Sequence, residues 1–195
     1  MKNIVVFASG SGSNFQSIID AIQAGELNAR IVGLISNKQG IKSIERAEKN
    51  RIPYLVLSEN EFRTFDKYSN ILLHQLEKWD ADLIVLAGFL RKIPPNVIQK
   101  FEHRILNIHP SLLPKFGGKG FYGLHVHKAV IESGDIFSGC TIHVVSEDYD
   151  KGPILDQAKV PVFENDTPQD LANRVLEQEH ILYPKVISNY LKTIS

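Results

Sequence analysis

The sequence predicts an α/β protein with a three-layer fold: a mostly parallel, twisted sheet, helices on both of its faces, and an antiparallel hairpin extension near the C-terminal part. Short apolar runs alternate with amphipathic stretches along most of the chain, which is the pattern of β–α–β units. Late in the chain, two apolar runs are separated only by a tight acidic loop, which indicates a hairpin. The 195 residues are 43% hydrophobic and 23% charged, as in ordinary globular proteins. We therefore expect a single domain over residues 1–195.

Strands and helices are predicted to alternate in the first half of the chain. The strands are short apolar runs at residues 4–8, 31–36, 54–57 and 83–87. The helices carry apolar residues at helical spacing and cover residues 14–24, 41–50 and 61–78. In the third helix, the buried face is predicted to consist of Phe62, Phe65, Ile71, Leu72 and Leu76.

The second half begins with a strand at residues 104–109 and then changes character. The segment 116–123 has four glycines in eight residues, which excludes regular structure. A helix near residues 127–132 is predicted to follow it, and then the two strands of the hairpin, near residues 140–146 and 155–162.

The last helix has a clear start signal. Thr167 is its predicted N-cap, Pro168 its first residue, and Asp170 completes a capping box. Because proline lacks the N–H that a helix interior needs, Pro184 is expected to kink or interrupt this helix before residues 186–194.

Charge and composition exclude several classes of protein. Lysine plus arginine and aspartate plus glutamate number 22 each, so there is no basic surplus for a nucleic acid. The lone Cys140 excludes an intrachain disulfide. The run at 83–90 is far shorter than the ~18 residues of a membrane span, and a cytoplasmic protein is expected. His125 and His127 do not share a helix face and lack further ligands at zinc spacing, so no metal site is expected.

The strand at residues 104–109 ends on two polar side chains. Asn107 and His109 leave the same face of an extended strand, roughly 6–7 Å apart at the backbone, and Pro110 ends the strand there. Ligands bind at the carboxyl ends of parallel strands. An amide beside a titratable imidazole suits a developing oxyanion, although a capping or turn role fits these two residues as well.

Three further segments carry polar groups whose role the pattern leaves open. The turn 9–14, between the first strand and the first helix, suits a phosphate but equally a plain Gly/Ser turn; Phe15 replaces the third glycine of a dinucleotide motif. The loop 147–153 supplies three carboxylates, or is a solvated turn. Glu179 lies on the apolar stripe of the last helix, where it must find a partner or stay at the edge.

These motifs together resemble the folate-dependent formyltransferases, and within that family the branch that acts on glycinamide ribonucleotide. The segment from Asn107 to Pro114 reads N-I-H-P-S-L-L-P and carries the family signature at every position. The glycine-rich turn, the Asp150-x-Gly-Pro loop and Gln178-Glu179-His180 extend the resemblance over essentially the full chain. The resemblance implies transfer of a formyl group from 10-formyltetrahydrofolate, as cosubstrate, to the amine of glycinamide ribonucleotide, without a metal. Self-association into a homodimer is left open.

The resemblance also implies roles for individual residues. The implied catalytic residues are Asn107, His109 and Asp150, and a carboxylate close to the imidazole would raise its pKa and favour the cation. The implied contacts to the ribonucleotide are made by Gly12, Ser13 and Asn14 at the phosphate and by Glu179 at the ribose hydroxyls. The implied folate contacts are the backbone of Leu90, Arg91, Lys92 and Ile93, together with Asn107.

Some positions depart from the family pattern, and related activities remain as alternatives. Phe65 stands where many members have an arginine, and Leu176 stands where a glutamine is frequent. The glycine-rich insertion after Pro114, at Gly117–Gly123, is hypothesised to be a flap over the site. Formyltetrahydrofolate deformylase and methionyl-tRNA formyltransferase share the signature but usually carry a further N-terminal and C-terminal domain, respectively. A folate- or phosphate-binding module without activity is the non-enzymatic alternative.

Overall fold

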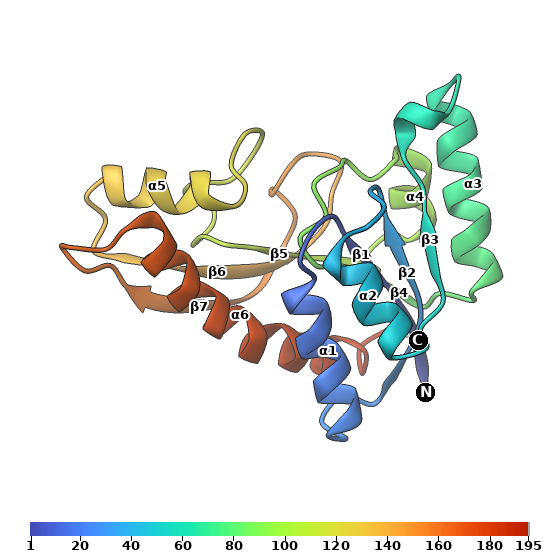
Figure 1. Ribbon diagram of the computed structural model, residues 1–195, viewed down its shortest axis with the longest axis horizontal. Coiled ribbons are helices and arrows are strands. Elements are labelled where there is room, and N and C mark those ends of the chain that lie inside the picture. Colours follow the sequence, from blue (N-terminus) through green and yellow to red (C-terminus); the bar gives the residue numbers. More distant parts are fainter. Residues whose placement is uncertain (195) are drawn as a thin grey trace.

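The computed structural model describes residues 1–194 and contains one seven-stranded sheet with the strand order β3-β2-β1-β4-β5-β6-β7. The parallel strands are β1 (Lys2–Ala8), β2 (Ala29–Ser36), β3 (Tyr54–Val56), β4 (Leu83–Leu86) and β5 (Ile105–His109). The antiparallel strands are β6 (Phe137–Val144) and β7 (Ile154–Pro161), which extend the sheet to one side (Figure 1). The predicted α/β fold with a hairpin extension is confirmed.

Helices cover both faces of the sheet, so that its central strands are buried on both sides. They are α1 (Ser13–Gln23), α2 (Lys42–Lys49), α3 (Phe65–Lys78), α4 (Pro95–Lys100), α5 (Leu124–Glu132) and α6 (Pro168–Tyr190). Alternate residues of β1 divide between two clusters of buried side chains. Ile4 and Val6 belong to the cluster that includes buried residues of α1, α2, α5 and α6, whereas Val5 and Phe7 belong to the cluster that includes those of α3 and α4.

The third helix differs from its prediction in its start and in its buried face. A 3-10 turn occupies Glu59–Glu61, and the helix begins only at Phe65, after its N-cap Thr64. Phe65 and Ile71 are 42% and 37% exposed, so their predicted burial is wrong. In the shorter helix, the buried stripe consists of Tyr68, Leu72 and Leu76, which follow the i, i+4, i+8 spacing. Ser69, next to Tyr68, is buried as well.

Two proline-containing segments also differ from expectation. The short helix α4 has no counterpart among the predicted elements, although Pro95 at its first position is a recognised start signal. Six residues are too few to show a helical period. Helix α6 continues through Pro184 to Tyr190, so the expected interruption is wrong. Because Tyr183, Val186 and Ile187 are buried against the sheet, tertiary packing holds the helix across the missing N–H.

Helix α6 is hydrogen-bonded to the central strands β4 and β5. The buried hydroxyl of Tyr183 lies 3.0 Å from the carbonyl oxygen of Leu86 and 3.1 Å from that of Leu106, so its single hydrogen is shared between β4 and β5. Burial raises the pKa of Tyr183 well above its usual value, which keeps this hydroxyl a donor. The last residue of β4 and the second residue of β5 are thereby held against one face of α6.

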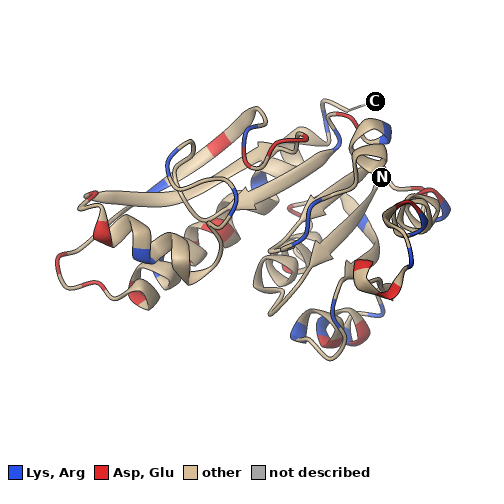
Figure 2. Cartoon of the chain, turned by 90° about the horizontal axis from the view of Figure 1, so that it is seen from above, with Lys and Arg blue, Asp and Glu red and all other residues tan. Residues whose placement is uncertain are grey.

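Charged residues of both signs are spread over the helices and loops (Figure 2). Within residues 1–194, no helix combines the length and apolar character needed to cross a membrane.

The pairing of β6 with β7 leaves no room for a side chain at Gly139. A Cβ added there would lie 1.9 Å from the carbonyl oxygen of Ala158 on β7 and 2.8 Å from the Leu112 side chain. We expect Gly139→Ala to lower the free energy of unfolding by about 2 kcal/mol or more, because the strands must separate. Urea unfolding measures this, with Gly10→Ala as the control because no heavy atom lies within 4 Å of its added Cβ. Equal midpoints for the two variants would contradict the tight pairing.

Candidate active site

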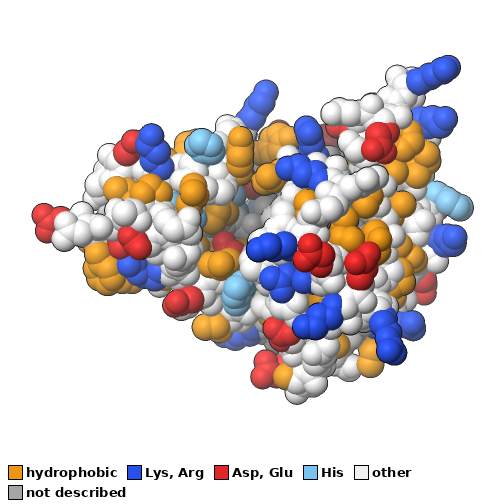
Figure 3. Space-filling view, in the orientation of Figure 1, with side chains coloured by type: hydrophobic (Ala, Val, Ile, Leu, Met, Phe, Trp, Pro, Cys, Tyr) orange, Lys and Arg blue, Asp and Glu red, His pale blue; other side chains and the backbone are white. Residues whose placement is uncertain are grey.

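A cavity of about 670 Å³ lies at the carboxyl ends of the central strands. Its walls come from segments far apart in the sequence: the turn 10–14, the loop 86–93, the end of β5, the loop 145–150 and the face of α6. The space-filling view shows the molecule hollowed at its centre (Figure 3). Among residues 1–194, no group of three or more histidine, cysteine, aspartate or glutamate side chains is arranged to hold a metal ion.

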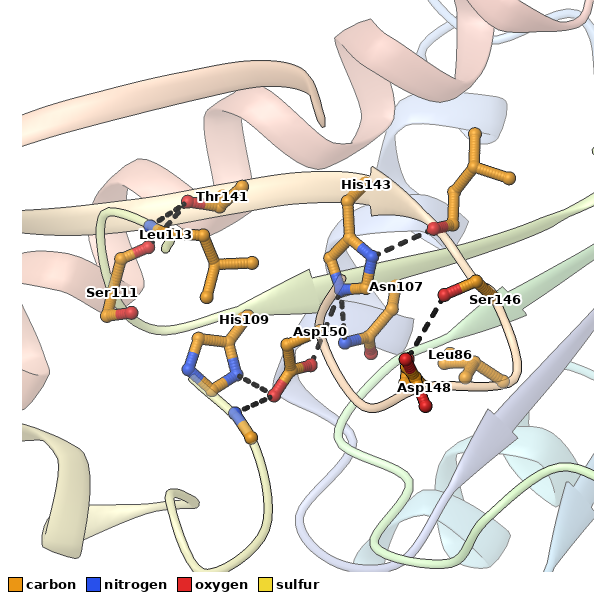
Figure 4. A network of polar contacts seen from close by, with 12 residues as sticks. Leu86, Asn107, His109, Ser111, Leu113, Thr141, His143, Ser146, Asp148 and Asp150 are labelled. Carbon is orange, nitrogen blue, oxygen red and sulfur yellow. Dashed lines mark hydrogen bonds and ion pairs between the residues drawn. The ribbon is translucent and has the colours of Figure 1, made fainter. Parts of the chain in front are cut away.

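Asn107, His109 and Asp150 meet in this cavity (Figure 4). The first two end β5, and Asp150 lies in the loop that follows its antiparallel neighbour β6. The His109 Nδ1 atom is 3.6 Å from Asp150 Oδ2. The structure therefore brings the three sequence-predicted catalytic residues together, through strand pairing rather than through proximity in the chain.

The imidazole of His109 is buried between two acceptors. Its Nε2 lies 2.8 Å from the carbonyl oxygen of Phe116, opposite the side that faces Asp150. Burial lowers the pKa of His109, and the Asp150 carboxylate and the Phe116 hydrogen bond raise it; the pKa remains below its usual value. Asp150 thus raises the pKa of His109 as expected, but burial lowers it by more. His109 is therefore neutral at pH 7 rather than cationic.

Asp150 stays ionised although its surroundings are partly desolvated. Burial raises the pKa of its carboxyl group, but the nearby imidazoles of His143 and His109 and the Gly118 N–H, 2.8 Å from Oδ2, bring it below its usual value. The site at rest therefore combines a carboxylate with a neutral imidazole.

His143 is the site residue that sequence reasoning missed. It lies opposite Asn107 in the β5–β6 pairing and is 2% exposed. Its Nε2 is 3.0 Å from the Asn107 amide nitrogen and 3.5 Å from Asp150 Oδ1, while its Nδ1 contacts the Val144 carbonyl at 3.0 Å. With Nδ1–H donating to that carbonyl, Nε2 accepts from Asn107 and orients the amide. The available signal was a single histidine in a strand that carries no Asp, Glu, Lys or Arg.

The glycine-rich turn forms a further part of the cavity wall. Gly12 is the N-cap of α1 at φ 67°, and an added Cβ would lie 2.7 Å from the Ser43 Cβ. Ser13 and Asn14 begin the helix, where backbone N–H groups have no intrahelical acceptor. The three residues predicted to hold a phosphate therefore line the cavity together.

Glu179 reaches the same wall from α6. Its carboxylate accepts a hydrogen bond of 2.6 Å from the amide nitrogen of Asn14, 165 residues away in the chain. Glu179 is only 7% exposed, so the alternative of a residue at the edge of the stripe is wrong. Burial raises the pKa of this carboxyl to about 7, and the Asn14 hydrogen bond only partly opposes the shift.

The loop after β4 lines the cavity with Leu90, Arg91, Lys92 and Ile93. The N–H of Leu90 already donates to the Ser9 hydroxyl at 3.0 Å, so this group is not free to bind a ligand. Ile93 is buried, whereas Leu90 is 54% exposed. Of the two departures from the family pattern, Leu176 lines the cavity, and Phe65 is not among the residues that line it.

Known proteins similar to this chain share both its sequence and its fold. Phosphoribosylglycinamide formyltransferase, chloroplastic, of Arabidopsis thaliana is 49% identical over 95% of this chain and 64% of that protein. The chain thus spans less than two thirds of the length of this relative. Phosphoribosylglycinamide formyltransferase of Escherichia coli (strain K12) is 41% identical over 95% of this chain and 85% of that protein. The crystal structure of glycinamide ribonucleotide transformylase 1 from Symbiobacterium toebii superimposes with a TM-score of 0.93 at 36% identity, covering 99% of this chain and 89% of that one.

The match at the level of the family covers nearly the whole chain. The formyl transferase family matches residues 2–187, which include the glycine-rich turn, the end of β5, the loop of Asp150 and Glu179. This chain belongs to the formyl transferase family.

Proposed function

We propose that this protein transfers the formyl group of 10-formyltetrahydrofolate to the amine of glycinamide ribonucleotide, giving formyl-glycinamide ribonucleotide and tetrahydrofolate in purine biosynthesis. The observation that carries the proposal is the convergence of Asn107, His109 and Asp150 in a cavity that is also lined by a helix N-terminus and a buried carboxyl group. The names of the relatives, phosphoribosylglycinamide formyltransferase, support formyl transfer to this ribonucleotide.

The two walls of the cavity suit the two substrates. The N-terminus of α1, at Gly12, Ser13 and Asn14, offers N–H groups and a positive dipole end to the phosphate. The Glu179 carboxylate accepts hydrogen bonds from the ribose hydroxyls. The folate lies along the loop from Leu90 to Ile93, where the apolar side chains contact the ring face and free backbone groups bind its edge.

In the proposed reaction, the amine of the ribonucleotide attacks the formyl carbon and a tetrahedral intermediate forms. The Asn107 amide, oriented by His143, donates a hydrogen bond to the developing oxyanion. His109 is neutral at rest, so it can take up positive charge as the reaction proceeds, and the Asp150 carboxylate stabilises that charge. The pair moves the proton from the attacking nitrogen to the departing folate nitrogen. These steps require neither a metal nor a redox cofactor.

A spectrophotometric assay with 10-formyltetrahydrofolate, run with and without glycinamide ribonucleotide, tests the proposal. We expect tetrahydrofolate to form only when the ribonucleotide is present, with stoichiometric formylation of its amine. Loss of formyl groups in the absence of the amine would identify a hydrolase instead. Binding of the folate without turnover in either case would identify a binding module.

A further inference from the structure

The glycine-rich insertion contacts the catalytic pair through its backbone. The carbonyl oxygen of Phe116 accepts a hydrogen bond of 2.8 Å from His109 Nε2, and the N–H of Gly118 donates one of 2.8 Å to Asp150 Oδ2. His109 and Asp150 are in turn 3.6 Å apart. One short turn, residues 116–118, therefore contacts both members of the pair: it meets His109 at Nε2, the nitrogen away from Asp150, and Asp150 at Oδ2, the oxygen that faces His109.

The backbone of this turn is unusual where it makes these contacts. Phe116 has φ 56° and Gly118 has φ 91°, and Asp150 itself has φ 53°. A positive φ is rare for a bulky residue and persists only where surrounding structure imposes it. Between them, Gly117 is packed so closely that an added Cβ would lie 2.5 Å from the Leu113 side chain and 3.3 Å from the Cβ of Asp150. The turn is thus shaped against Asp150.

The chemistry of the contacts determines where hydrogen lies on the imidazole. A carbonyl oxygen only accepts, so Nε2 of His109 carries the hydrogen that faces Phe116. In the neutral ring Nδ1 is then bare, and it faces Asp150 Oδ2. The opposite tautomer would place a bare Nε2 lone pair against the Phe116 carbonyl oxygen, which is repulsive. A second proton can enter the ring only at Nδ1, where the carboxylate stabilises it.

We propose that residues 116–118 position the catalytic pair: the Phe116 carbonyl sets the Nε2–H tautomer of His109, the Gly118 N–H orients Asp150, and the proton moved during catalysis therefore binds at Nδ1. The catalytic part of this inference rests on the proposed formyl transfer; the tautomer does not. The other titratable groups at the pair are His143, 3.5 Å from Asp150, and His127, whose pKa burial lowers to about 4 so that it adds no charge.

The tautomer can be measured directly on the wild-type protein. We expect ¹⁵N-edited NMR of histidine-labelled protein at pH 8, with His109 identified through His109→Ala, to show a neutral ring protonated at Nε2. On lowering the pH, the resonance of Nδ1 should report the uptake of the second proton. A neutral ring protonated at Nδ1 would overturn the proposal, whatever the enzyme's activity.

The variant that tests the turn is Gly118→Ala, because alanine does not readily adopt φ 91° and the N–H must leave Asp150. Gly134→Ala is the matched control: Gly134 also has a positive φ, 73°, and nothing lies within 4 Å of its added Cβ. We expect Gly118→Ala to mix the two tautomers of His109 and to lower kcat about tenfold with little change in either KM. The acid limb of the pH dependence of kcat in Gly118→Ala should move to higher pH, because Asp150 loses a hydrogen-bond donor that favours its ionised form.

The outcomes separate this inference from the proposed function. A wild-type protein that fails to formylate the ribonucleotide, yet shows the Nε2–H tautomer, would remove the function and leave the tautomer assignment standing. An active wild-type protein whose Gly118→Ala variant keeps the same tautomer and pH profile would overturn the role of the turn. An equal loss of kcat in Gly134→Ala would assign the effect to general strain and overturn it as well.

Discussion

Asp150→Asn is expected to lower kcat about 10²–10⁴-fold while the fold is retained. The amide can still accept from Gly118 N–H, so the loop keeps its shape, but it carries no charge with which to stabilise a protonated His109. Because burial already lowers the pKa of His109, removing the carboxylate leaves the imidazole without the larger of the two influences that oppose burial.

Steady-state kinetics with both substrates measure this effect, and Asp148→Asn is the matched control. Asp148 lies in the same loop, where its side chain is 72% exposed and forms an ion pair with Lys151. It should keep kcat within about twofold, since exposed ion pairs contribute little. A turnover close to wild type in Asp150→Asn would remove Asp150 from the proposed mechanism.

Glu179→Gln is expected to weaken binding of the ribonucleotide and to stabilise the protein at alkaline pH. The folded-state pKa of about 7 lies above the usual 4.5, so the native state binds this proton more tightly than the unfolded chain does. Wild-type stability should therefore fall as pH rises from 4.5 to 7, by up to about 3 kcal/mol in total. Glutamine is never ionised and removes this loss, but it offers only one acceptor oxygen to the ribose hydroxyls.

The measurements are KM for the ribonucleotide and urea unfolding, each at pH 6 and pH 8. For the wild type, KM should rise as pH falls below about 7, where the carboxyl becomes protonated. In Glu179→Gln, KM should be about tenfold higher than in the wild type at pH 8. Because glutamine does not ionise, the rise of KM below about pH 7 should be absent. Glu177→Gln, an exposed position on the same helix, is the control for charge. If the difference in unfolding free energy between Glu179→Gln and the wild type is the same at both pH values, the raised pKa of Glu179 is contradicted.

Local sequence was enough to predict those parts of the structure that depend on residues close together in the chain. The alternation of side chains in a strand and the stop at Pro110 place Asn107 and His109 on one face at a strand end, and the structure has them there. The capping box of Thr167 and Asp170 is likewise a contact between close neighbours, and it forms as predicted. The same holds for the β–α–β order, because it depends on the periodicity of each segment by itself.

The length and exposed face of individual helices were less predictable. Phe65 and Ile71 are at least as apolar as Tyr68, which was not predicted to be buried, and only the packing of α3 on the sheet buries Tyr68 together with the predicted Leu72. Pro184 follows the same logic: its local penalty is real, but the buried residues on either side keep α6 continuous.

The sequence by itself determined the fold class, the family and the polar pair that ends β5. Only the tertiary structure decided the protonation of the site, because the free energy of a charge depends on how much water and which partners surround it. The lowered pKa of His109 results from contacts between segments that lie apart in the chain. The same is true of the buried pairing of Glu179 with Asn14 and of the contacts made by His143 and Phe116. No periodicity within one segment reports the burial that a distant segment imposes on it.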